Sequence, residues 1–211
     1  MSFKKILSKI EKELKEREEI KDELYDAMRK ATRLSKQAIF IVHKGQLKEA
    51  KKMLRKTKRL FNKLHEIPEG HRKLVYAGIV DSAFQEYAEA HVFLRLVQDN
   101  KFTGPKKIGV PSTSYLLGLA DVIGELRRRA LDSLRKGDVK GAEKNLETME
   151  LIYSEFMAMD EALRVVSELR RKSDVARRII EATRGDVTIE VRRSSLECSI
   201  KKLEEVLKTE K

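Results

Sequence analysis

The sequence contains few cysteines, prolines and aromatic residues. It has one cysteine, Cys198, three prolines and no tryptophan in 211 residues. A single cysteine excludes an intramolecular disulfide and a cysteine-based zinc site within one chain, so we expect a reducing, cytoplasmic location. The longest run without a charged residue, 108–120, spans thirteen residues and is too short to cross a bilayer. The N-terminal stretch MSFKKILSKIEKELKE becomes charged at once, so we expect no signal peptide.

The alternation of apolar and polar residues that marks β-strands is also absent. Apolar residues recur instead at spacings of three and four, which predicts amphipathic helices. The 41% hydrophobic content is enough for a buried core. We therefore predict an all-α fold, a bundle of six or seven long helices that forms one domain over residues 1–211. The expected helices start near Phe3 and Leu47, run over about 71–98 and 115–134, continue through Met157, and fill 161–207 with a break at Gly185.

Positive charge is concentrated in one part of the chain. The formal net charge is +12, and residues 44–73 carry eleven Lys or Arg against three Glu, which is +8 of that total. Such a segment favours a polyanionic partner, and RNA is the partner we expect. A solvated face is the alternative for each residue, and a membrane surface is disfavoured by the absence of Trp. The candidate RNA-binding residues are Lys48, Lys52, Arg55, Arg59, Lys63, Arg72, Lys73, Arg127, Arg128 and Arg129.

Two apolar helices each carry a pair of carboxylates. In FQEYAEA, Glu86 and Glu89 are three residues apart, and in YLLGLADVIGEL, Asp121 and Glu125 are four apart. Each spacing places both carboxylates on one helix face. Neighbouring negative charges about 5 Å apart repel by roughly 3 kcal/mol at an effective dielectric constant near 20. A divalent cation removes this repulsion, and carboxylate oxygens favour Mg²⁺ or Mn²⁺.

Basic side chains offer another way to balance these carboxylates. Arg95, Arg128 or Arg129 are spaced to neutralise Glu89 or Glu125 on the same helices. The histidines give no support for a different metal, because the Glu-x-x-His pattern of di-iron bundles is absent. We therefore interpret the histidines as surface or packing residues: His43, His65, His71 and His91.

The segments FQEYAEA, YLLGLADVIGEL and SLRKGD together resemble the core of the translin and Trax family. The resemblance covers most of the chain. It implies an all-helical protein that forms octamers and binds nucleic acid. On the Trax side, the matching carboxylates hold Mg²⁺ and cut RNA; the matching positions here are Glu86, Glu89, Asp121 and Glu125.

The sequence departs from the family pattern in two places. Ser114 stands where the family commonly has an acidic residue before the tyrosine, and the segment between the two acidic motifs is short. We interpret the chain as a compact archaeal-type relative that acts without a separate translin partner. The first hypothesis is a Mg²⁺-dependent endoribonuclease that cleaves short single- or double-stranded RNA inside a homo-octameric shell. The second is a non-catalytic oligomer that binds RNA or single-stranded DNA.

Overall fold

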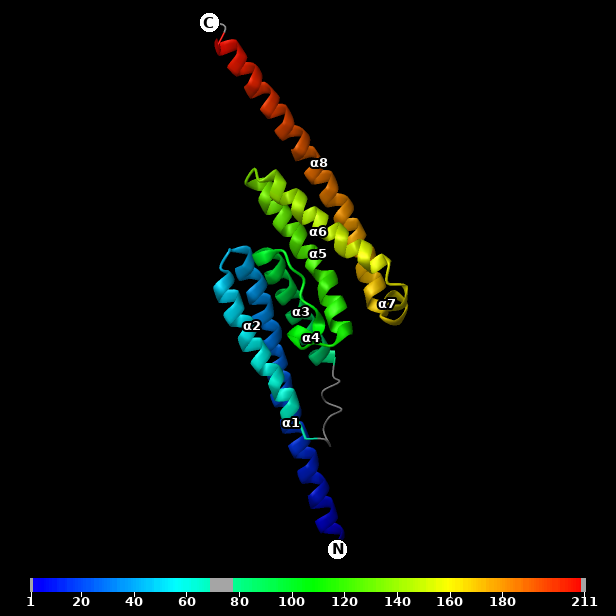
Figure 1. The fold of residues 1–211 in the computed structure, drawn as a ribbon. Helices are drawn as coiled ribbons and strands as arrows, with labels where there is room; N and C mark the ends of the chain where they lie inside the picture. Colours follow the sequence, from blue (N-terminus) through cyan, green and yellow to red (C-terminus); the bar gives the residue numbers. More distant parts are fainter. Residues whose placement is uncertain (1, 69–77, 210–211) are drawn as a thin grey trace. The chain divides into compact units, whose positions relative to one another are not determined.

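The structure, a computed structural model, describes residues 2–68 and 78–209, and it confirms the all-α fold class. Within these ranges the chain forms eight α-helices and one short 3₁₀ segment, with no β-strand (Figure 1). The elements are α1 (Phe3–His43), α2 (Leu47–Asn62), η1 (Lys63–Glu66), α3 (Gly78–Asp99), α4 (Pro105–Ile108), α5 (Ser112–Arg135), α6 (Val139–Met157), α7 (Asp160–Val165) and α8 (Ser167–Thr209).

The boundaries differ from the predicted ones at three places, one of which is Val166, where the segment expected to be helical over 161–207 is divided into α7 and α8. The interval between the expected helices 71–98 and 115–134 contains the single-turn helix α4, which begins with Pro105 and ends at Gly109 with a φ of 79°. Proline at the first position and a left-handed glycine at the end are the usual signals for such a turn. The predicted break at Gly185 is wrong, because α8 continues through it. One exposed glycine costs only about 1 kcal/mol in a helix interior, which a long helix tolerates. The predicted start near His71 lies outside the described residues.

Two similar segments, KGQLKEAKKML and KGDVKGAEKNL, build the turns that precede α2 and α6. Gly45 and Gly137 both have a φ of 75°, a conformation that glycine adopts without strain. Five residues later, Ala50 and Ala142 are fully buried. A small side chain at this position lets the first turn of the new helix pack closely, so the repeated sequence encodes a repeated helix start.

Contacts within the chain define two compact units, residues 1–118 and 119–211. In the first unit, α2 and α3 pack on α1, and Met28, Val42 and Phe93 are fully buried. The ring of Phe61 on α2 lies 4.5 Å from that of Phe84 and 5.3 Å from that of Tyr87, both on α3. The single-domain prediction for residues 1–211 stays a prediction.

The second unit contains the rest of α5 together with α6, α7 and α8. Helices α6 and α8 lie side by side (Figure 1), and Phe156 of α6 and Leu169 of α8 are buried. Arg184 of α8 donates from Nη2 to Oε1 of Glu150 on α6 at 2.7 Å. Among the helices of the described ranges, none is both long and apolar enough to cross a membrane.

Two long helices expose apolar stripes near their free ends. The first twelve residues of α1 present Phe3, Leu7, Ile10 and Leu14, each 47–73% exposed. The last turns of α8 present Leu196, Ile200, Leu203 and Leu207, each 48–61% exposed. Both sets follow spacings of four, three and four residues, which is the seam of a coiled coil. These stripes therefore have the spacing of a surface that packs on another helix.

Candidate functional site

The carboxylates of α3 lie on a largely buried helix. Glu89 is only 9% exposed, and Glu86 is half-buried. Lys36 of α1 places its Nζ atom 3.1 Å from Oε1 of Glu86. The first unit therefore already supplies a positive charge to one member of this acidic pair.

A glycine on α5 brings a second helix against the same stretch of α3. A Cβ atom at Gly118 would lie 2.5 Å from the carbonyl oxygen of Gln85 and 2.9 Å from the amide nitrogen of Glu89. It would also lie 3.0 Å from Cβ of Ala88. Backbone atoms cannot move aside as a side chain can, so only glycine permits this approach. The start of α5 is thus held against the segment of α3 that carries both carboxylates.

The carboxylates of α5 belong to the second unit. Asp121 and Glu125 are both half-buried and lie about 40° apart around the helix axis, from 3.6 residues per turn. The Nζ atom of Lys172 on α8 donates to Oδ1 of Asp121 at 2.5 Å. Lys172 is itself mostly buried, with its side chain 15% exposed. This acidic pair also receives a lysine from another helix of its own unit.

The donor set fits a hard divalent cation by its chemistry. All four predicted ligands are carboxylates, which hold Mg²⁺ and Mn²⁺ through oxygen. In the part of the chain that the structure describes, no group of three or more His, Cys, Asp or Glu side chains is arranged to hold a metal ion. The four residues are divided between the two units, with two in each. Their assembly into one site therefore stays a prediction.

Two of the arginines considered in the sequence analysis have structural partners. Arg95 forms an ion pair with Asp99, with Nη1 and Oδ2 2.9 Å apart. Arg127 donates from Nη1 to Oγ1 of Thr183 at 2.7 Å, and its Nη2 lies 3.4 Å from Oδ2 of Asp186. Arg127 therefore links α5 to α8, while the neighbouring Arg128 is exposed and Arg129 is half-buried.

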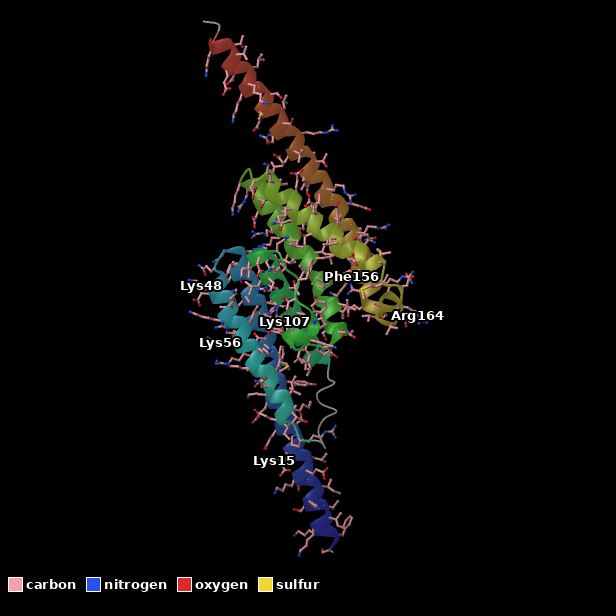
Figure 2. The ribbon with its side chains drawn as sticks, viewed as in Figure 1. Lys15, Lys48, Lys56, Lys107, Phe156 and Arg164 are labelled. Carbon is pink, nitrogen blue, oxygen red and sulfur yellow. The ribbon has the colours of Figure 1, made fainter. Side chains whose placement is uncertain are left out.

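Helix α2 has the two faces that its sequence predicts. Its apolar stripe is buried, and Lys48 and Lys56 project outward from the opposite face (Figure 2). Lys52 forms an ion pair with Glu49 at 2.8 Å. Of the predicted RNA-binding residues in this region, Lys48, Lys52, Arg55, Arg59 and Lys63 are exposed, whereas Arg72 and Lys73 lie outside the described residues.

Two histidines pack against aromatic rings, as the sequence analysis expected. The ring of His43 lies 4.8 Å from Phe93, and that of His91 lies 5.9 Å from Tyr87. Burial lowers the pKa of His91 to about 4 and raises the pKa of Tyr87 to about 12, so both rings are neutral near pH 7. The side chain of His65 and all of His71 lie outside the described part of the chain.

Sequence reasoning missed three residues that shape this region. Gly118 could have been identified from the sequence, because an isolated glycine inside a helix has a cost that a close packing contact explains. Lys36 and Lys172 could not have been identified in this way. Each lies far along the chain from the carboxylate it contacts, and each resembles any other lysine on an amphipathic helix.

Comparison with known proteins identifies the class of this fold. The model of the Translin family matches residues 19–207. An uncharacterized protein of Methanocaldococcus jannaschii, MJ0175, is 31% identical over 199 residues, which cover 90% of this chain and 85% of the relative. The chain belongs to the Translin family.

Solved structures show the same fold. The structure of AfC3PO in complex with duplex RNA is 35% identical with a TM-score of 0.75, and it covers 89% of this chain and 97% of its own. The crystal structure of AfC3PO is 34% identical with a TM-score of 0.78 and the same coverage. The crystal structure of apo-NeC3PO is 24% identical with a TM-score of 0.77, covering 87% of this chain and 96% of its own, and shows the fold alone.

The close approach at Gly118 is testable against a second glycine of α5. Gly118→Ala is expected to lower the free energy of unfolding by about 1–2 kcal/mol, because overpacking against backbone outweighs the better helix propensity of alanine. Gly124→Ala is the matched control, since its Cβ meets no described atom within 4 Å. It should be neutral or stabilise by up to about 1 kcal/mol. Urea unfolding measures both, and equal stabilisation by the two substitutions contradicts the packing role.

Proposed function

We propose that this chain is a Trax-type endoribonuclease that uses Mg²⁺ or Mn²⁺ to cleave short RNA. The observation that carries the proposal is the carboxylate pair on each of two mostly apolar helices, including the buried Glu89. The structure of AfC3PO in complex with duplex RNA, whose sequence is 35% identical to this chain, supports RNA as the ligand. The assignment to the catalytic side of the family rests on Glu86, Glu89, Asp121 and Glu125 at the matching positions. A cytoplasmic location stays a prediction from the single cysteine.

The proposed chemistry assigns separate work to the carboxylates and the basic residues. Glu86, Glu89, Asp121 and Glu125 would hold the cation, which supplies polarisation of a phosphodiester and stabilisation of the leaving oxygen. A carboxylate oxygen that is not engaged with the cation can accept the proton of the attacking water. The outer face of α2 would hold the phosphates, so recognition depends on backbone charge and shape rather than sequence.

A second candidate function has a specific observation in its favour. Lys36 and Lys172 already neutralise Glu86 and Asp121 within the two units. If these ion pairs are permanent, the carboxylates are structural, and the protein is a non-catalytic oligomer that binds RNA or single-stranded DNA. A membrane-surface role is disfavoured because the inward face of α2 is buried in the first unit: Ala50, Leu54, Thr57 and Phe61.

Substitution of the carboxylates separates the two candidates. Glu86→Gln, Glu89→Gln, Asp121→Asn and Glu125→Gln are each expected to lower RNA cleavage by about 10²-fold or more, the usual cost of losing one charge-stabilising group. Chelation with EDTA should have a similar effect on the parent. Cleavage is measured on a short labelled RNA, with circular dichroism to confirm the helical fold.

Asp81→Asn on α3 and Asp132→Asn on α5 are the matched controls. Asp81 is exposed and Asp132 pairs with Arg135, 3.2 Å away. Both controls should cleave at the parent rate. Parent-like cleavage by all four site variants, or cleavage that survives EDTA, would remove the metal-dependent assignment and leave the binding protein.

The basic face of α2 gives a separate prediction for RNA affinity. Replacing Lys52, Arg55 and Arg59 together by Gln should weaken binding similarly for unrelated sequences. The slope of log K against log salt should become shallower by roughly 0.7–0.9 for each lost phosphate contact. Filter binding at several salt concentrations measures both quantities.

The repeat provides the control for this triple variant. Lys136, Lys140 and Lys144 occupy the corresponding segment before and within α6, are all exposed, and carry the same charge. Their replacement by Gln should leave the affinity and the salt slope unchanged. An unchanged slope in the α2 variant would make α2 a solvated face and redirect the search to Arg127, Arg128 and Arg129.

Assembly is the remaining part of the proposed function. We expect a homo-oligomer, an octamer by resemblance to the family, because the exposed stripes of α1 and α8 need apolar partners. Light scattering should give a mass well above the 24.4 kDa of one chain. Ile200→Ser with Leu203→Ser should lower that mass. Lys201→Ser with Glu204→Ser, off the stripe, should not, and a parent at the mass of one chain rules out the assembly.

A further inference from the structure

A cavity of about 360 Å³ lies within the first unit, between α2, α3 and α4. Its volume falls at the small end of the roughly 300–1,000 Å³ range of ligand pockets. It does not include the predicted metal ligands. Glu89 lies about 160° and Glu86 about 140° around α3 from His91, which lines the cavity, at 100° per residue. The cavity is therefore separate from the acidic face of α3.

Positive charge converges on this cavity from three helices. The lining includes Lys51, Arg55, Lys58, Arg95 and Lys107. Asp99 is paired with Arg95, and in the described ranges the four other cations form no ion pair. Several unbalanced cations around one small space repel each other, and a bound anion of charge near −2 removes much of that repulsion.

A half-buried histidine at the wall has one ring nitrogen without a hydrogen-bond partner in the described part of the chain. The Nδ1 atom of His91 is buried and has no hydrogen-bond partner among the described residues. Buried polar atoms without partners are rare in folded proteins and call for an explanation. Arg95, Lys58 and Lys107 all act on this ring, adding to the burial that lowers the pKa of His91. Cationic side chains of α2, α3 and α4 thus all act on the ring of His91.

The rest of the lining is apolar and aromatic apart from Thr103. Leu54, Leu94 and Ile108 form part of the wall, and Tyr87 contributes its ring. This combination suits a ligand with a highly charged group and a flat or apolar remainder. A nucleotide has that composition, because its phosphate needs several donors and its base can pack on aromatic and aliphatic side chains.

We propose that this cavity is a binding site for the phosphate monoester of a nucleotide, held by Lys51, Arg55, Lys58, Arg95 and Lys107 beside His91. The phosphate can belong to a free mononucleotide or to the 5′ end of an RNA chain. Neither source depends on cleavage by the carboxylates. The cavity is thus a site that reads a terminal phosphate, and it shares only Arg55 with the residues of α2 proposed to contact internal phosphates.

Calorimetry with adenosine 5′-monophosphate, and with adenosine as its uncharged match, tests the site at about 0.15 M salt, where distant charges are screened. The parent should bind the monophosphate at least tenfold more tightly than adenosine. Lys58→Gln with Lys107→Gln should lose at least tenfold in affinity for the monophosphate. Both residues are exposed, so the fold should survive their replacement.

Lys56→Gln with Lys106→Gln is the matched control. Lys56 and Lys106 are exposed and lie on the same two helices as Lys58 and Lys107, but they do not line the cavity. Their replacement removes the same charge. Figure 2 shows Lys56, which does not line the cavity, projecting outward from α2, and Lys107, which does line it, on α4. The control should bind the monophosphate within twofold of the parent. Equal losses in the two double variants would reduce the effect to general charge and overturn the site.

Short RNAs of one sequence, with a 5′-phosphate or a 5′-hydroxyl, identify the source of the phosphate. A preference for the phosphorylated end that the Lys58/Lys107 variant loses assigns the site to RNA termini. Binding of the monophosphate without such a preference assigns it to free nucleotides. The proposal is overturned if the parent protein binds the monophosphate no more tightly than adenosine and the 5′-phosphate RNA no more tightly than the 5′-hydroxyl RNA. Glu86→Gln should keep the phosphate binding, so loss of cleavage in that variant bears on the nuclease and not on this site.

Discussion

Carboxylate charge on an apolar helix must be balanced, and this requirement organises both units of the chain. An unbalanced pair about 5 Å apart costs roughly 3 kcal/mol at an effective dielectric constant near 20. In each unit a lysine from a different helix approaches one carboxylate, Lys36 for Glu86 and Lys172 for Asp121. The acidic residues therefore contribute to helix packing even before any cation is considered.

This balance also means that the proposed metal ion would compete with the ion pairs for the same oxygens. Breaking a partly buried ion pair without replacement leaves a charge that is costly to desolvate. A divalent cation can take the place of the ammonium group because it carries more charge and accepts several oxygen ligands. The proposed nuclease and the proposed binding protein thus differ in which cation the carboxylates hold when RNA is present.

The sequence predicts the elements of this structure well and their contacts poorly. Helical periodicity identifies the long helices, and the repeated Lys-Gly segments identify the turns at Gly45 and Gly137. The glycine signal failed at Gly185, because a long helix tolerates one glycine. Lys36 and Lys172 were not predictable, since their roles depend on which helices pack together. The cavity beside His91 was missed for the same reason: its cations come from three helices and form no motif in the sequence.

Helix α3 shows how one element can serve two opposite kinds of charge. At 100° per residue, Glu86 and Glu89 lie about 80–180° around the helix axis from the cavity-lining residues of α3, so the anionic and cationic environments face different neighbours. The acidic side meets Lys36 of α1, and the backbone beside Glu89 meets Gly118 of α5. The other side meets the cations of α2 and α4. The helix thus separates the proposed phosphate site from the carboxylates, which limits the repulsion between a bound phosphate and Glu86 and Glu89.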